Sequence, residues 1–172
     1  MADGGYPDLS VGDECQFAVE LTPAEFALVD RADSHLELVD GCDYRFSGGA
    51  VFATPRAVVL GVGILCFVAP PTSKRICVGQ SVRGTGRLSV DPLYWQGNDS
   101  RAKGAPGLVY RWAIDGIGLN TTTFAVDPEP QSSTTRPPSV IPSKASLLPV
   151  FKTDAMRERG GYVLNCRLLG DL

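Results

Sequence analysis

The chain has 172 residues and a formal net charge of −3 at pH 7, and 44% of its residues are hydrophobic. These values are typical of one globular domain, residues 1–172, and they exclude a disordered chain and a coiled coil. The longest apolar run, residues 57–70, is shorter than the roughly 20 residues that span a bilayer as a helix. The acidic N-terminus contains no apolar signal segment, so we expect a cytoplasmic protein that does not enter a membrane.

The N-terminal region predicts one strand and one helix. Residues 15–21 alternate between apolar and polar side chains, which is the pattern of a half-buried β-strand. Thr22, Pro23 and Glu25 then occupy the positions of an N-cap, a first helical residue and a capping box. We therefore expect a short helix over residues 23–31.

Three further strands are expected in the next part of the chain. Residues 35–39 predict a short strand, and residues 44–54 are rich in side chains that favour strands. In the second of these segments, Gly48 and Gly49 indicate a bulge or a bend. Residues 57–68 are apolar on both faces, which predicts a central strand that is buried on both sides.

The strongest strand pattern lies at residues 82–90, where the side chains alternate without interruption. Arginine, threonine and serine occupy one side, and valine, leucine and glycine occupy the other. The glycines on the inward side, Gly84 and Gly86, leave room for tight curvature or for the close approach of another backbone, as barrel corners require.

A loop and a further strand follow. Residues 91–107 are rich in glycine and proline and predict a loop, with Tyr94 and Trp95 near its start. Residues 108–119 alternate and predict a strand. Gly116 is expected to shift the register of this strand, so that the apolar residues after it face inward again.

The C-terminal part of the chain has a different composition. Residues 127–149 contain six prolines and many serine and threonine residues. Because proline donates no hydrogen bond, this segment predicts an extended loop and no regular ladder. A helical turn is expected over residues 153–159, and residues 162–168 alternate again and predict a last strand that closes a sheet.

About six or seven strands with little helix predict an all-β, mainly antiparallel fold. We expect a small closed or partly open Greek-key barrel with one or two short helices, a long Pro/Ser/Thr-rich loop at residues 127–149 and a flexible segment at residues 1–10. The architecture resembles the OB type because of the curved, glycine-bearing strand at residues 82–90 and the two-sided apolar strand at residues 57–68. This resemblance is one of architecture and implies no function.

The sequence contains no recognisable catalytic or metal site. A serine or cysteine nucleophile needs a neighbouring base, and the only histidine, His35, lies in a strand-like stretch typical of a surface or edge residue. The five cysteines form no Cys-x-x-Cys pair, so we interpret them as reduced, small hydrophobic side chains. An enzyme that used Asp91, Tyr94 or Arg87 has no further support. We expect a protein that is not an enzyme and that needs no metal and no cofactor.

Charge is distributed unevenly along the chain. Residues 1–45 contain eleven acidic and two basic residues, a net charge of −9, whereas residues 74–111 contain seven basic and two acidic residues, a net charge of +5. Two such segments either attract different partners or neutralise each other within a compact fold. We favour the interpretation that the two segments neutralise each other within the fold.

The first functional hypothesis is a non-catalytic module that binds another protein, such as an inhibitor, an immunity-type protein or an accessory subunit of an assembly. The acidic N-terminal third, the Pro/Ser/Thr-rich segment and the aromatic pair Tyr94 and Trp95 motivate it. The aromatic pair fits a plug for the end of the barrel equally well. An exposed edge strand, either residues 15–21 or the C-terminal strand, could also pair across a dimer, and nothing in the sequence selects between the two.

The second hypothesis is single-stranded nucleic-acid binding by a basic and aromatic face. Arg83 and Arg87 point the same way along one strand, and Arg111 lies on the polar face of another. The complete set of candidate binding residues is Arg83, Arg87, Tyr94, Trp95, Arg101, Lys103 and Arg111. Because the acidic total charge weakens the long-range attraction for phosphates, nucleic acid ranks after protein as the expected partner.

Overall fold

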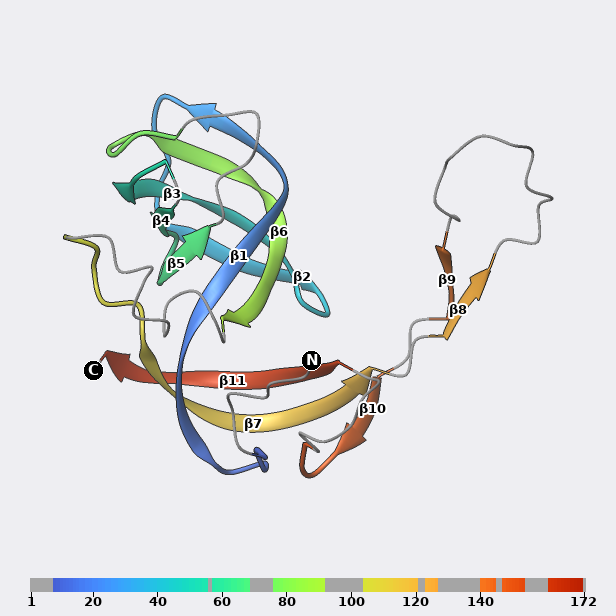
Figure 1. Cartoon of the computed structure of the whole chain (residues 1–172). Coiled ribbons are helices and arrows are strands. Elements are labelled where there is room, and N and C mark those ends of the chain that lie inside the picture. Colours follow the sequence, from blue (N-terminus) through green and yellow to red (C-terminus); the bar gives the residue numbers. More distant parts are fainter. Residues whose placement is uncertain are drawn as a thin grey trace.

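The computed structural model describes residues 8–55, 57–68, 76–91, 104–120, 123–126, 140–144, 147–153 and 161–171. All the regular structure in these residues is β-strand, so the expected helices are absent from the described part of the chain (Figure 1). In chain order the strands are β1 (Glu14–Val29), β2 (His35–Asp40), β3 (Asp43–Ala53), β4 (Val58–Gly61), β5 (Leu65–Val68), β6 (Ser81–Asp91), β7 (Tyr110–Asn120), β8 (Thr123–Val126), β9 (Val140–Lys144), β10 (Leu147–Val150) and β11 (Tyr162–Asp171).

Five strands close a β-barrel. β1 pairs with β6, β6 with β3, β3 with β4, and β4 with β5, all of them antiparallel. β5 then closes the barrel by a parallel contact with β1, in which Phe67 lies opposite Glu20. β2 pairs with the first half of β3 and extends the sheet on the outside of this barrel. The prediction of an all-β, mainly antiparallel barrel is therefore confirmed.

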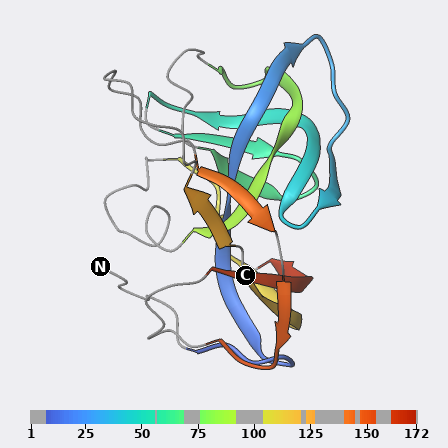
Figure 2. The same ribbon diagram turned by 90° about the vertical axis from the view of Figure 1, so that its right-hand side faces the viewer.

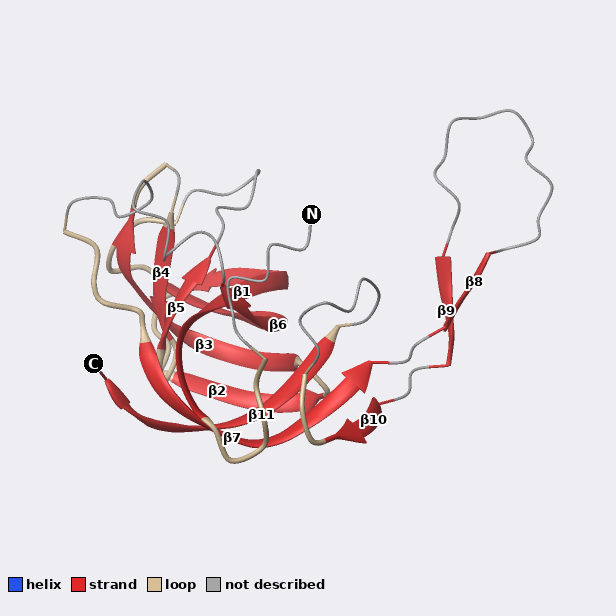
Figure 3. Cartoon of the chain, turned by 60° about the horizontal axis from the view of Figure 1, so that its bottom comes forward, coloured by secondary structure: helices blue, strands red, loops and turns tan. Residues whose placement is uncertain are grey.

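A second, smaller sheet lies across one end of the barrel and is built around β7 (Figures 1 and 3). β7 pairs with β11 along most of its length, with the first four residues of β1, and with β10. β1 is sixteen residues long and belongs to both sheets, and Figure 2 shows it running from this sheet to the far end of the barrel. β8 and β9 pair only with each other within the described residues, and their hairpin projects from the rest of the structure.

Three aromatic side chains join the two sheets where β1 passes from one to the other. The rings of Phe17 and Trp112 stack with their centroids 5.3 Å apart, and the edge of Tyr110 packs against Trp112 at 6.0 Å. The polar atoms of Trp112 and Tyr110 are hydrogen-bonded. The Trp112 indole Nε1–H donates to the Phe17 carbonyl at 3.1 Å, and the Tyr110 hydroxyl accepts from the Leu65 amide at 2.8 Å. The start of β7 is thereby fixed to both β1 and β5.

Apolar side chains fill the barrel and also cover part of its outer surface. The interior cluster contains fourteen buried residues, among them Phe46, Leu60 and Val82, each at most 1% exposed. A separate cluster lies on the outer face of β1, β4 and β5, where the segment before β7 packs over them. Its buried members are Ala18, Ala57, Val59, Phe67 and Leu108.

The inward glycines of β6 have the role that their position predicts. A Cβ atom on Gly84 would overlap the Glu25 carbonyl oxygen of the neighbouring strand, and one on Gly86 would lie 2.7 Å from the Thr22 carbonyl oxygen. β1 therefore crosses β6 at a separation that only glycine permits. The predicted faces of this strand are confirmed, since Val82 is fully buried whereas Arg83 and Arg87 are exposed.

The prediction of a helix over residues 23–31 is wrong. β1 continues through this region to Val29 and pairs with β6 as far as Ser81. Pairing with a complete neighbouring strand satisfies more backbone groups than the local capping signature could, so tertiary structure overrides local propensity. Pro23 is accommodated because the register shifts between Pro23 and Glu25, where a strand tolerates a residue without an N–H.

The prediction of one central strand over residues 57–68 is wrong in its number of strands. The segment folds into the hairpin β4–β5, whose turn contains Gly63 with a φ of 108°. The predicted burial on both sides is confirmed, since Val58 and Val59 point in opposite directions and are at most 2% exposed. Gly61 and Gly63 are a signal for this turn, because glycine readily adopts a positive φ, but the uninterrupted apolar character of the segment favours a single buried strand.

The predictions for the other strands had mixed outcomes. The strands at residues 35–39, 108–119 and 162–168 are confirmed as β2, β7 and β11. The register shift near Gly116 is confirmed, because Gly116 lies opposite Asn165 whereas Ile114 lies opposite Cys166. The irregularity of β3 lies between Ala50 and Phe52, beyond the glycine pair where it was expected.

The Pro/Ser/Thr-rich segment is not entirely without regular structure. Strands β9 and β10 lie within it or at its end, with Pro142 and Pro149 in their ladders, so the exclusion of any ladder was wrong for these stretches. Both strands are short, and edge strands can accommodate proline. Residues 127–139 lie outside the described residues, as do residues 154–159 of the helical turn expected over residues 153–159. Residues 1–7 of the segment expected to be flexible also lie outside them, whereas Ser10 bridges to Lys152.

The close contact between β1 and β6 predicts that Gly84→Ala lowers the free energy of unfolding by about 1–3 kcal/mol, the usual cost of overpacking. Gly49→Ala is the matched control, because a Cβ atom there would meet nothing within 4 Å. We expect this control to change the stability by less than about 0.5 kcal/mol. Urea unfolding of the two variants checks the prediction, and equal stabilities would contradict it.

Candidate interaction surfaces

The outer face of β6 presents the two arginines on which the nucleic-acid hypothesis depends. Arg83 lies opposite Ser47 of β3, and Arg87 lies opposite Asp43. The Arg87 guanidinium contacts the Asp43 carboxylate at 3.3 Å, and both side chains are exposed. One of the two arginines is therefore already paired with an acidic residue, and the face carries both signs of charge.

The remaining candidate residues do not extend this face in the described part of the chain. Arg111 lies opposite Gln16 near the start of β1, whereas Arg87 lies opposite Thr22, so about 20 Å of strand separates them. The Arg111 guanidinium contacts the carboxylate of Glu14 at 2.8 Å. The other four candidates, Tyr94, Trp95, Arg101 and Lys103, lie outside the described residues.

These ion pairs join the acidic N-terminal third to the basic middle of the chain. Asp43 and Glu14 come from the former, and Arg87 and Arg111 come from the latter. Exposed pairs of this kind each stabilise a fold by about 0–1 kcal/mol, so they matter mainly because they neutralise charge. The expectation that the two segments neutralise each other in part is confirmed for these residues.

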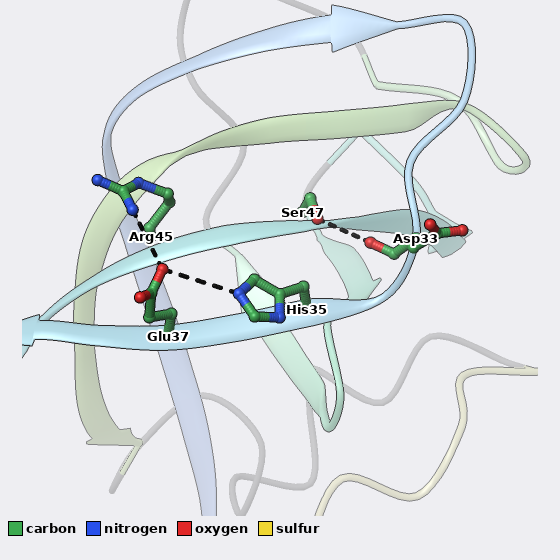
Figure 4. A network of polar contacts seen from close by, with 5 residues as sticks. All are labelled: Asp33, His35, Glu37, Arg45 and Ser47. Carbon is green, nitrogen blue, oxygen red and sulfur yellow. Dashed lines mark hydrogen bonds and ion pairs between the residues drawn. The ribbon is translucent and has the colours of Figure 1, made fainter.

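A polar network surrounds the only histidine of the chain on β2 and β3 (Figure 4). The Glu37 carboxylate accepts a hydrogen bond from Arg45 at 3.1 Å and lies 3.8 Å from His35 Nε2. The Ser47 hydroxyl donates to the backbone carbonyl of Asp33 at 2.7 Å. A serine nucleophile must instead donate to its base, so the network has the geometry of an exposed polar surface and not of a catalytic triad.

All five cysteines are free thiols, and four of them lie in environments that suppress reactivity. Burial raises the pKa of Cys66 to about 12, and burial together with nearby Cys15 and Asp115 raises the pKa of Cys166 to about 12. The pKa values of Cys15 and Cys42 are also raised, chiefly by burial. Nucleophilic cysteines have lowered pKa values, so these four thiols are not activated. No group of three or more potential metal ligands occurs among the described residues.

Three strands of the two main sheets pair on one side only within the described residues, namely β2, β10 and β11. An unpaired edge is a site for association unless charge, proline or short length protects it. β2 has six residues, and His35, Glu37 and Asp40 give it charged or polar protection. β10 has four residues, one of which is Pro149.

β11 is the least protected of the three edges. It has ten residues and contains no proline. Its Arg167 is held by two contacts of 3.3 Å with the carboxylate of Asp115 on β7, so its charge is neutralised within the sheet. Two apolar side chains beside it, Leu168 and Leu169, are 41% and 37% exposed. The other charged residue of β11, Asp171, is its last residue. A long edge strand without proline, whose arginine is already ion-paired, is the kind of surface to which another strand can be added.

The structure thereby selects between the two edge strands that the sequence left open. Residues 15–21 lie in β1, which has partners in both sheets, whereas the C-terminal strand β11 has β7 as its one partner among the described strands. Alternation of residues 162–168 predicts a strand but gives no information about which side is paired. Whether a strand lies at an edge or in the middle of a sheet depends on the sheet topology.

No family model, curated protein or solved structure matches this chain. Within the described residues, the structure has no helix with the length and apolar character needed to cross a membrane. The surfaces of the chain itself therefore supply the functional information.

Burial predicts a strong order of reactivity among the thiols. Exposed Cys77 should react first with iodoacetamide at about pH 8, whereas Cys66 and Cys166 should react only after unfolding in urea. Mass spectrometry of peptides from native and unfolded samples checks this order. Rapid modification of Cys166 in the native protein would show that its thiol is more accessible and more acidic than its surroundings predict.

Proposed function

We propose that this protein is a non-catalytic interaction module, of the accessory-subunit or inhibitor type, which binds another protein chain along the edge of β11. The observation that carries the proposal is the contrast between the three edges: β2 and β10 are short and contain charged residues or proline, whereas β11 has ten residues, no proline and an arginine, Arg167, that is paired with Asp115. Cytoplasmic location is part of the same proposal.

Strand addition explains how such an edge can bind without a pocket. The main-chain N–H and C=O groups of an added strand give affinity, and the side chains on each face of the sheet give specificity. Exposed Leu168 and Leu169 supply apolar area for contact, while the Arg167–Asp115 pair avoids a buried unpaired charge. This chemistry requires no nucleophile, base or metal.

The strand order also supports a finer description of the barrel as a Greek-key, OB-like type. β3, β4 and β5 follow one another as antiparallel neighbours, and β6 returns by a longer connection to lie beside β3. A fourth strand beside the first of three is the Greek-key order. OB-type barrels serve mainly as binding platforms, which is compatible with an interaction module but does not select its partner.

Single-stranded nucleic-acid binding is the alternative function. It is favoured by Arg83, which is exposed on β6 and makes no ion pair with any described residue. The pairing of Arg87 and Arg111 with carboxylates and the acidic total charge weaken it. If it holds, Arg83→Ala combined with Arg87→Ala should abolish a salt-sensitive affinity for oligonucleotides.

Affinity purification of the tagged full chain from its own cells tests the proposal. We expect a stoichiometric protein partner that survives nuclease treatment and is lost when Leu168 and Leu169 are both changed to lysine, because charged side chains block an edge. The matched control changes Leu38 and Val39, which are 56% and 57% exposed on the edge of β2, to lysine.

The outcomes separate the two functions. Retention of the partner by the β2 variant and its loss from the β11 variant support strand addition at β11. Equal behaviour of the two variants contradicts it, and recovery of nucleic acid, or of partners that disappear with nuclease, favours the alternative. Thermal unfolding of each variant establishes that the fold is intact.

A further inference from the structure

We infer that the chain bound at the edge of β11 is a second copy of this protein, paired antiparallel about a two-fold axis that passes beside Cys166. This inference rests on the proposed function, because it uses the same edge, and it specifies the occupant. Two observations support it: the pattern of side chains along β11 and the neutralisation of the charge on that strand.

Two-fold symmetry restricts the registers that two copies of β11 can adopt. Opposite residues in an antiparallel pair lie on the same face of the sheet, so the axis must pass beside a residue and not between two residues. Two registers align the greatest length of the described strand, one centred on Cys166 and the other on Arg167. The second places Arg167 directly opposite Arg167 of the other copy, which is destabilising.

The register centred on Cys166 gives compatible neighbours on both faces. Arg167 lies opposite Asn165 of the second copy, and Leu164 lies opposite its Leu168. Leu164 and Leu168 share the inner face of the sheet, since they lie opposite the buried residues Ile117 and Trp112 of β7. Two register shifts interrupt the pairing of β11 with β7. The one between Asn165 and Cys166 leaves the extra residue, Asp115, on β7, so β11 itself is continuous there, and the other follows Leu168.

Charge also favours self-association at this edge. Two identical surfaces repel each other when each carries a net charge. On β11, Arg167 is paired with Asp115 of its own chain, so two copies can approach along the strand without repulsion between these groups. An isologous contact of this kind closes after two copies and leaves no further β11 edge exposed.

Asn165 offers a test in which the sign of the effect depends on the register. It is exposed and would face Arg167 of the second copy, so Asn165→Asp should strengthen the dimer and Asn165→Arg should weaken it. Each cross-strand charge pair changes an association constant roughly 1.4- to 5-fold, and symmetry supplies two pairs. We therefore expect changes of about 2- to 30-fold in opposite directions.

Sedimentation equilibrium of the purified full chain measures these dissociation constants. Ser89 is the matched control, because it is exposed on β6 in the barrel, and Ser89→Asp and Ser89→Arg change the net charge equally. The inference predicts a wild-type dimer, opposite shifts for the Asn165 variants and similar dissociation constants for the two Ser89 variants. Circular dichroism of every variant confirms that the comparison is made between folded proteins.

Failure of this inference is distinguishable from failure of the proposed function. A wild-type protein that remains monomeric overturns the second copy as occupant, and so does a dimer whose stability is indifferent to the sign of the charge at Asn165. Neither result affects the purification experiment, in which a different protein bound through β11 would still be lost from the lysine variant.

Discussion

The arrangement of the molecule depends on β1 being a single strand with partners in two sheets. Its first residues pair with β7, and the rest pairs with β6 and touches β5. Phe17 lies where β1 leaves one sheet for the other, stacked on Trp112, whose indole N–H bonds to the Phe17 backbone. Tyr110 in turn accepts a hydrogen bond from the β4–β5 hairpin. The contacts of these three aromatic residues therefore fix the barrel and the second sheet to each other.

This constraint also determines which strands are left at the edge of a sheet. β1 would be an attractive edge by its sequence, but it has partner strands in both sheets, namely β7 in one and β6 and β5 in the other. β7 is central in the second sheet, with β11 on one side and both β1 and β10 on the other. β11 is left at the outside of this sheet, and its length and its ion-paired arginine are the reasons for proposing this edge, rather than β2 or β10, as the surface for association.

Periodicity predicts the strands that lie on the boundary between core and solvent. In β6 and β7, apolar and polar side chains alternate because one face of each strand packs inward. The sequence therefore predicted the inward and outward faces of both strands, and also the register shift near Gly116 in β7. The predictions were wrong where local signals compete with tertiary pairing. Pro23 and Glu25 have the pattern of a helix start, yet β6 provides a complete partner strand. At the β4–β5 turn, the two glycines Gly61 and Gly63 lie within an apolar run that favours one continuous strand.

The candidate site could be predicted only in part for a similar reason. Exposure of Arg83 and Arg87 follows from alternation along one strand, but the pairing of Arg87 with Asp43 depends on strand register. The same applies to β11, because an alternating sequence has the same appearance at the edge and in the centre of an antiparallel sheet. Which strand is an edge depends on contacts between residues far apart in the chain.

Amide hydrogen exchange tests most directly whether β11 is the binding edge. The measurement compares the assembled protein, purified from its own cells, with the same protein after dissociation by dilution. The account predicts that peptides covering residues 162–171 exchange more slowly in the assembly, while peptides from the edge strand β2, residues 35–40, exchange at unchanged rates. Equal exchange of residues 162–171 in both states, or protection of β2 instead, would contradict it.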